Sequence, residues 1–437
     1  MRRLKIILGC LVSLLVLASS VPAADAPQPA APAPANPQDQ PQQSQEQRFQ
    51  DMERRIQELE SSARSGKDSA DPESKAFPGS WPMYGTDLRI KLGGYVKTDF
   101  LYDIDGTTDK NQFLMSTIPV NGTPEHANGG YAAFFSKETR FNMDVRRVTP
   151  GVVPLSAFIE GDFWTTGSSQ FRLRHAYMNV GDLTIGQTWT TLSFVETLPF
   201  MIDFAAGDAL FGGRTSLIRY KMKLSDRWHM AVALESFDFL GIENPNGFGG
   251  KATTTFPLLA VSADYKWDTG HLWMGSSLAQ LRWDGGATGP TDNAPQIDAV
   301  VAGKQYLGTD NYFTFNISGG KGSGENIMAF AGSEANAVLN ASGKLDTMPA
   351  FAAVVGFWHR WSQELSSNFC YAYGWLDTPD SRAPLALKAG GIQHMNLIWQ
   401  PWKQFSTGIE YMWGTVRAQN HEMGRASRIQ TMAKFAF

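Results

Sequence analysis

The sequence has 437 residues, a formal net charge of −4 and 18% charged residues, a balance that points to neither nucleic acid nor a strongly charged partner. Its two cysteines are Cys10 and Cys370, and Cys10 falls within a predicted leader, so the mature chain cannot form an intrachain disulfide. Beyond that leader no apolar run reaches 18 residues, which excludes a spanning helix but not a membrane β-barrel.

The first 24 residues have the layout of a secretory signal peptide. Basic residues in the first five positions precede an apolar run that extends to Ala18, and small residues follow at Ala23 and Ala24. Too few apolar residues precede Cys10 for a lipoprotein signal. We therefore expect residues 1–24 to be removed on export from the cytoplasm.

A tether and a helix are predicted next. Residues 25–45 are rich in proline, alanine and glutamine, which predicts an extended tether. Residues 46–65 carry apolar residues three and four positions apart, which predicts a short periplasmic coiled-coil helix that clamps an oligomer; the alternative is a lone amphipathic helix. These apolar residues are Phe49, Met52, Ile56, Leu59 and Ala63. Residues 66–87 form a linker.

From residue 88 to residue 437 the chain alternates with period two, and its connections fall into two length classes. Short connections are expected at residues 148–152, 179–182, 224–228, 267–271, 307–310, 360–364 and 400–404. Longer connections are expected at residues 103–130, 164–170, 190–214, 239–256, 284–296, 319–350, 377–391 and 417–426. Strict alternation of the two classes predicts an all-β fold, a transmembrane 16-stranded antiparallel β-barrel as in trimeric porins.

The alternation also assigns a face to each side chain. Val96 falls on an apolar side that we assign to lipid, whereas Lys97 falls on the side that we assign to water. His175 and Tyr177 fall on the outer side, where the histidine would need a neighbouring subunit as its contact. Cys370 falls on the lumen side.

The predicted inner faces carry more arginine and lysine than aspartate and glutamate. Summed positive charge in a pore favours anions, and guanidinium groups can bind carboxylates with two hydrogen bonds. The alternative is that wall charges pair with one another and only keep the lumen wet. The predicted pore-lining bases are Lys97, Arg140, Arg146, Arg172, Arg174, Arg219 and Lys221.

One long connection, residues 191–213, is too apolar for a solvated loop. We expect it to fold into the barrel and narrow it, with Glu196, Asp203 or Asp208 facing the basic wall and creating a transverse field. The rival interpretation places its apolar residues at a contact between subunits.

Several motifs carry a family resemblance. KLGGYVKTDFLYD (91–103), EGDFW (160–164), FRLRHAYMNVG (171–181), IGQTW (185–189) and the terminal Phe437 resemble the DcaP-like outer-membrane porins. The resemblance implies a homotrimeric sixteen-stranded channel in the outer membrane of a Gram-negative bacterium, with a periplasmic coiled coil. It also implies uptake of dicarboxylates and other small organic anions.

Other classes of function fit less well. The segment QHMN (393–396) is the nearest approach to a catalytic pair, but no serine nucleophile accompanies it, so we predict no enzyme. The histidines lack metal-ligand spacing and no nucleotide motif occurs, so we expect no cofactor, no metal and no nucleic-acid partner. A general or differently selective porin that also anchors the envelope, by binding peptidoglycan through its N-terminal region, stays open as an alternative.

Overall fold

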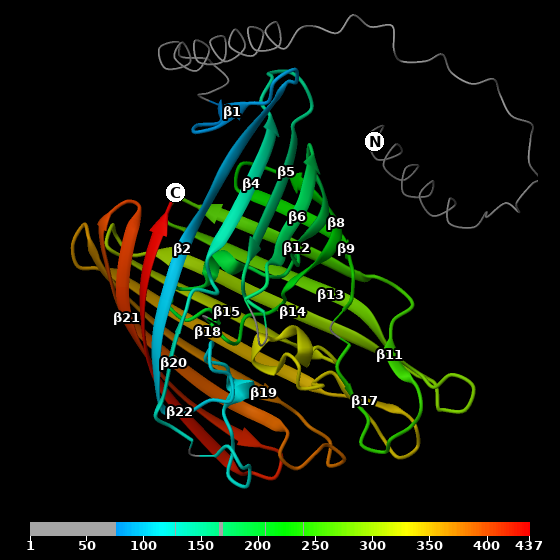
Figure 1. Cartoon of the computed structure of the whole chain (residues 1–437). Coiled ribbons are helices and arrows are strands. Elements are labelled where there is room, and N and C mark those ends of the chain that lie inside the picture. The colour runs from blue at the N-terminus through cyan, green and yellow to red at the C-terminus, as the bar shows by residue number, and fades with distance from the viewer. Residues whose placement is uncertain (1–75, 127, 166–168, 206, 239) are drawn as a thin grey trace, which may run out of the picture. The chain divides into compact units, whose positions relative to one another are not determined.

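A computed structural model describes residues 76–437 apart from residues 127, 166–168, 206 and 239 (Figure 1). The predicted signal peptide (1–24), tether (25–45), coiled-coil helix (46–65) and the first part of the linker lie outside the described residues. No helix in the described part of the chain is long and apolar enough to cross a membrane.

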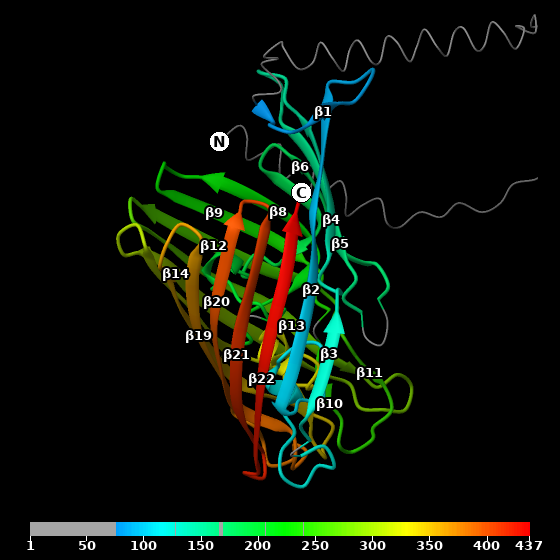
Figure 2. The same cartoon turned by 60° about the vertical axis from the view of Figure 1, so that its left-hand side comes forward.

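The described chain forms a closed antiparallel barrel of sixteen strands, which confirms the predicted fold class. Each strand pairs with the next along the chain, and β22 pairs with β2 to close the barrel, as Figure 2 shows. The barrel strands are β2 (Leu88–Asp105), β4 (Arg140–Arg147), β5 (Leu155–Asp162), β6 (Arg172–Val180), β7 (Leu183–Trp189), β8 (Arg214–Lys223), β9 (Trp228–Glu235), β12 (Leu258–Trp267), β13 (Gly270–Asp284), β14 (Asp292–Tyr306), β15 (Asn311–Lys321), β18 (Pro349–Arg360), β19 (Leu365–Leu376), β20 (Leu387–Trp402), β21 (Phe405–Ala418) and β22 (Met423–Ala436).

Short elements decorate this barrel. Strand β3 (Tyr131–Phe135) pairs with β2 ahead of β4, β1 (Trp81–Pro82) pairs with β2, and β11 (Lys251–Thr253) pairs with β13. A separate small sheet joins β10 (Ile242–Glu243), β16 (Ala337–Leu339) and β17 (Leu345–Thr347). The 3-10 helices are η2 (Met115–Thr117), η3 (Val195–Thr197), η4 (Gly324–Asn326) and η5 (Met328–Phe330).

The connections alternate in length as predicted. All seven short connections occur where the sequence indicates them. The long connections are present too, but several are shorter than predicted: the fifth covers only residues 285–291 and the last only residues 419–422, because the flanking strands extend further than expected. The short and long connections therefore lie at opposite ends of the barrel.

The side chains alternate between an apolar outer face and a mostly polar inner face. On β2, Val96, Phe100 and Tyr102 are exposed, whereas Lys97 and Asp99 are buried. Exposed aliphatic and aromatic side chains recur on the outer face of most strands. An outer band of this kind suits lipid, and the closed sheet leaves no unpaired edge.

The hydrophobic core lies inside the barrel. Three long connections contribute to it: loop 1 (residues 106–130), loop 3 (190–213) and loop 6 (322–348). Phe113 of loop 1, Leu192 of loop 3 and Phe330 of loop 6 belong to one buried cluster with inner-face residues such as Val300 and Ala352. The three loops thus fold inward and narrow the lumen, and irregular backbone at this depth is buried by protein.

The outward assignment of His175 and Tyr177 is wrong. The β5–β6 ladder shifts register between Glu160 and Gly161, so that Arg174 forms a bulge and the faces exchange beyond it. His175 is 7% exposed and its Nδ1 lies 3.0 Å from the hydroxyl of Thr188. It faces inward and needs no neighbouring subunit.

Candidate channel constriction

A row of cationic side chains follows the inner face from β22 through β2 to β8, and we call it the basic wall. It contains Lys434 of β22, Lys97 of β2, Arg140 of β4, Arg172 and Arg174 of β6, and Arg219 and Lys221 of β8. The sequence pattern assigns every member to the inner face, Lys434 included, because the alternation of β22 puts it on the same face as Gln430.

Loop 3 lies against the basic wall. The Nζ of Lys97 donates to the carbonyl oxygen of Ile202 at 2.6 Å. The guanidinium groups of Arg172 and Arg174 lie 5.6 and 5.8 Å from the ring centre of Phe204, within cation–π range. These contacts support the predicted constriction by the 191–213 segment.

Carboxylates pair with several of the bases. Arg172 donates to both oxygens of Asp162, at 2.9 and 2.8 Å. Arg174 donates to Asp162 at 2.9 Å and to Glu160 at 2.8 Å. The two guanidinium groups are therefore balanced by two carboxylates, as the pairing interpretation of the wall expected.

A second paired group lies on β2 and β4. Lys97 contacts Glu138 directly and lies 3.3 Å from Asp99, while Arg140 lies 3.5 Å from Glu138. Lys434 adds a third cation, with its Nζ 4.7 Å from the ring centre of Tyr95. Lys97, Arg140 and Lys434 thus face Glu138 and Asp99, three cations against two carboxylates.

The remaining bases are less restrained. Within the described residues, no carboxylate lies at ion-pair distance from Arg219, Lys221 or Lys434. Arg219 donates to the backbone oxygen of Trp189 at 3.3 Å, and Lys221 is exposed in the lumen. These side chains are available to a passing solute.

Arg146 lies apart from the others. It is near the short connection between β4 and β5, pairs with Asp144, and stacks 4.5 Å from the ring centre of Phe77. Half of its side chain is exposed. It therefore lines the short-connection end of the barrel and not the region beside loop 3.

The three acids of loop 3 have different positions. Glu196 is exposed in η3, and its charge acts on Lys221 of the basic wall. The expectation that Asp203 or Asp208 faces this wall is wrong. Asp208 accepts a hydrogen bond from the Met115 N–H at 2.6 Å, and Asp203 accepts one from the Phe113 N–H at 3.2 Å.

Both aspartates are therefore structural groups that hold loop 1. Neither carboxylate reaches solvent, and a buried charge is costly. Burial raises the pKa of Asp208 to about 7 and raises the pKa of Asp203 as well.

A buried network anchors loop 3 to β20 and β21, and sequence reasoning missed it. Glu410 accepts hydrogen bonds from the backbone N–H groups of Ile202 at 2.6 Å and Asp203 at 3.3 Å. It also lies 2.9 Å from His394 and accepts from the amide of Asn396 at 3.0 Å. His394 and Asn396 of QHMN therefore orient Glu410, and no sequence motif links them to it.

A polar hollow of about 520 Å³ lies beside loop 1 and the basic wall. Lys110, Lys137 and Arg172 line it together with the rings of Trp164 and Phe204, which stack with centres 4.0 Å apart. Within the described residues, no group of three or more His, Cys, Asp and Glu side chains could hold a metal ion.

A closed barrel with an apolar outer band, and with loops folded inward beside a cationic wall, defines an outer-membrane channel protein. The family model of the DcaP outer membrane protein matches residues 47–437, and the chain belongs to that family. This confirms the resemblance seen in the sequence.

Solved structures share the fold. The crystal structure of the outer membrane channel DcaP of Acinetobacter baumannii is 20% identical, with a TM-score of 0.71 over 82% of this chain and 100% of that chain. The anion-selective porin from Comamonas acidovorans is 10% identical, with a TM-score of 0.55 over 80% and 100%. A trimer form of OmpT from Vibrio cholerae is 12% identical, with a TM-score of 0.50 over 80% and 99%. No curated protein matches the sequence.

Proposed function

We propose that the protein is a diffusion channel for small hydrophilic solutes that prefers organic anions such as dicarboxylates. The observation that carries the proposal is the presence of cations on the basic wall that have no carboxylate at ion-pair distance among the described residues. These are Arg219, Lys221 and Lys434. Arg172 adds to them, because its side chain is 31% exposed whereas its partner Asp162 is fully buried. Arg174 and Lys97 are less exposed than their carboxylate partners and contribute little to this surface.

The wall suits a solute with two carboxylates. Arg140 and Lys434 both lie over the ring of Tyr95, with charged groups 5.4 and 4.7 Å from its centre, so one small dianion could contact both. Arg219 and Lys221 offer further contacts along β8. Binding at successive weak sites allows entry without trapping the solute.

The family and one structural neighbour support this proposal. The family is one of outer-membrane proteins, and a structural neighbour is an anion-selective porin. The matched proteins are channels, which favours the prediction that the chain is not an enzyme. We also propose a homotrimer in the outer membrane of a Gram-negative bacterium, with the coiled coil in the periplasm, because OmpT of Vibrio cholerae occurs in a trimer form.

The test is a reversal-potential measurement in planar bilayers under a salt gradient. We expect anion preference at low salt, and a shift toward cations in the Lys221→Gln, Lys434→Gln double variant. These lysines have no ion-pair partner among the described residues, so their replacement leaves no buried carboxylate unpaired. Arg172 and Arg174 are poorer choices for substitution, because both pair with Asp162 and their loss would leave that buried carboxylate without a partner.

Lys403→Gln is the matched control, since Lys403 is exposed in the short connection between β20 and β21. It should keep the parent reversal potential. A double variant with unchanged reversal potential and unchanged block by dicarboxylates at low salt would show that the basic wall does not set selectivity.

A further inference from the structure

The outer face of β19–β22 contains a hollow near the long-connection end. Its volume is about 430 Å³. Gly391 supplies no side chain at its floor, while Tyr373 and Thr415, its partners on the two neighbouring strands, rise on either side. Trp413 extends one wall, while Tyr371 leans over the glycine, with its hydroxyl oxygen 2.9 Å from the position that a Cβ of Gly391 would take. A glycine between larger outward side chains thus leaves a groove on the face that meets lipid, and the Tyr371 ring forms part of its floor.

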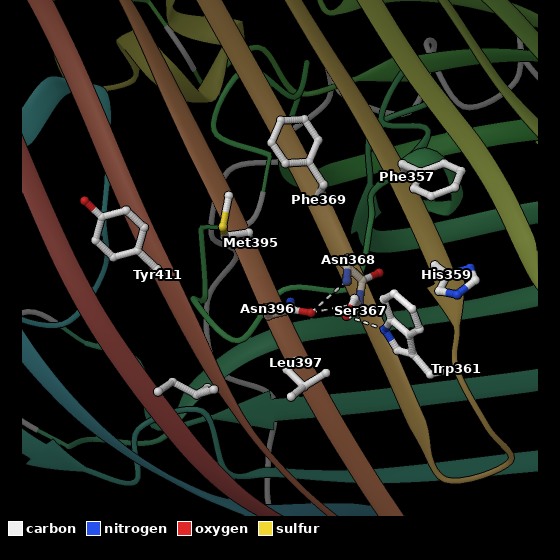
Figure 3. Close-up of a pocket in the computed structure, with 11 residues that line it drawn as sticks. Phe357, His359, Trp361, Ser367, Asn368, Phe369, Met395, Asn396, Leu397 and Tyr411 are labelled. Carbon is white, nitrogen blue, oxygen red and sulfur yellow. Dashed lines mark hydrogen bonds between the residues drawn. The ribbon is translucent and has the colours of Figure 1, made fainter.

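A second hollow lies on the same face, further toward the short-connection end. Figure 3 shows the next hollow, of about 790 Å³, with Phe369, Met395 and Tyr411 around it. Each of these residues lies two positions from a lining residue of the first hollow on the same strand, and so on the same face. The lower part is almost entirely apolar. We call the two hollows together the outer furrow.

The arginines of the furrow lie at its upper end. Arg417 lines it, and Arg425 of β22 opposes Thr415, so that both guanidinium groups face outward on adjacent strands. The Arg425 side chain is 73% exposed, with its nearest carboxylate, Asp105, at 3.8 Å. Within the described residues, Arg417 has no ion-pair partner and Gln393 has no hydrogen-bond partner.

Charge on a lipid-facing wall is tolerated only near the membrane surface, where it can meet headgroups. Arg417 and Trp413 are four residues apart, so the cation lies about 13 Å along the strand from the aromatic part of the groove. The furrow therefore has a cationic end and an apolar groove long enough for part of an acyl chain. A contact with a second protein would not require cations at one end and an apolar groove along the rest.

We propose that the outer furrow binds a phosphorylated outer-leaflet lipid of the lipid A type. Arg417 and Arg425 bind its phosphates, Gln393 donates to the carbonyl of an acyl linkage, and an acyl chain lies over the Tyr371 ring beside Gly391, between Tyr373 and Trp413. This assignment does not depend on the solute preference of the lumen.

The test is native mass spectrometry of the full delipidated protein titrated with diphosphoryl lipid A, monophosphoryl lipid A or phosphatidylethanolamine. We expect binding in that order of decreasing affinity. The Arg417→Gln, Arg425→Gln double variant should bind diphosphoryl lipid A about thirtyfold more weakly, the loss expected for two surface cations. Gly391→Leu, which fills the groove, should weaken all three lipids.

Arg282→Gln is the matched control, because Arg282 faces outward at the same end of the barrel on β13, outside the furrow. It should bind lipid A like the parent. The proposal is overturned if the double variant retains parent affinity or if Arg282→Gln loses as much. It is equally overturned if Gly391→Leu dissociates subunits without changing lipid binding, which would make the furrow a contact between copies.

Discussion

Cys370 shows how residue-scale predictions depend on what covers a side chain. The predicted inward orientation agrees with its register opposite His394, but its thiol is fully buried under the inward-folded loops. We therefore expect a charged, membrane-impermeant thiol reagent to label Cys370 only slowly in the folded protein, when the loops open, and rapidly after unfolding. Lys221→Cys, at an exposed lumen position, should label at once. Rapid labelling of Cys370 in the folded barrel would contradict the packing of loop 3.

Asp208 predicts a pH dependence of the same packing. Its pKa in the packed loop is about 7, above its usual 3.8, because burial disfavours the carboxylate. Asp208 therefore binds its proton more tightly in the packed loop than in the opened loop, so that protonation stabilises the packed loop. This contribution to the stability of the packed loop is complete below about pH 4 and is lost as pH rises through 7.

We expect Cys370 labelling to be faster in the parent than in Asp208→Asn, with a ratio that grows from pH 5 to pH 8. The comparison at each pH cancels the ionisation of the thiol itself. A ratio independent of pH would show that Asp208 does not control the loop.

Residue-level pairing was only partly visible in the sequence. EGDFW and FRLRHAY contain Glu160, Asp162, Arg172 and Arg174, but spacing alone does not show that these acids pair with these guanidinium groups. That pairing depends on the register between β5 and β6, and the register includes a bulge. Bulges leave no dependable sequence pattern.

At the scale of elements, Glu410 joins loop 3 to the barrel wall. Glu410→Ala removes the acceptor for two backbone N–H groups and leaves His394 without its partner. Breaking a buried pair of this kind costs about 3 kcal/mol. We expect loop 3 to loosen, with larger and noisier single-channel conductance in planar bilayers.

Glu364→Ala is the matched control for this prediction. Glu364 is exposed in the short connection between β18 and β19 and accepts from the indole of Trp399 at 3.2 Å. It should leave conductance unchanged. Equal conductance in Glu410→Ala and the parent would show that loop 3 is held by its apolar contacts alone.

Period-two alternation made the strands predictable, because lipid and water impose opposite demands on successive residues. The inward folding of loop 3 was also visible, since its apolar residues exceed what a solvated loop carries. Loop 6 was not, because Ile327, Phe330 and Leu339 are scattered among glycine and polar residues. Their common burial arises only when the loop meets the small inner residues of β14 and β18.

At the scale of the whole molecule, the lengths of the connections were enough to count the strands and to predict closure. Assembly is a separate matter, because the predicted helix (46–65) lies outside the described residues. A barrel wall that contacts its copies would supply most of the oligomer's contact, and a coiled coil of about two heptads is marginal alone. Association of the barrels therefore raises the local concentration of the helices, and association of the helices raises that of the barrels.

We accordingly expect the full chain to be a heat-modifiable trimer by native mass spectrometry. Deletion of residues 25–75 should leave a trimer that dissociates at a lower temperature. The Ile56→Asp, Leu59→Asp double variant should reproduce that loss, because it places charge in the heptad seam. The control Gln57→Asp, Ser61→Asp adds the same charge outside the seam and should keep the parent temperature. A monomeric full chain would refute trimer assembly, and equal loss in both double variants would make the helix a plain amphipathic segment.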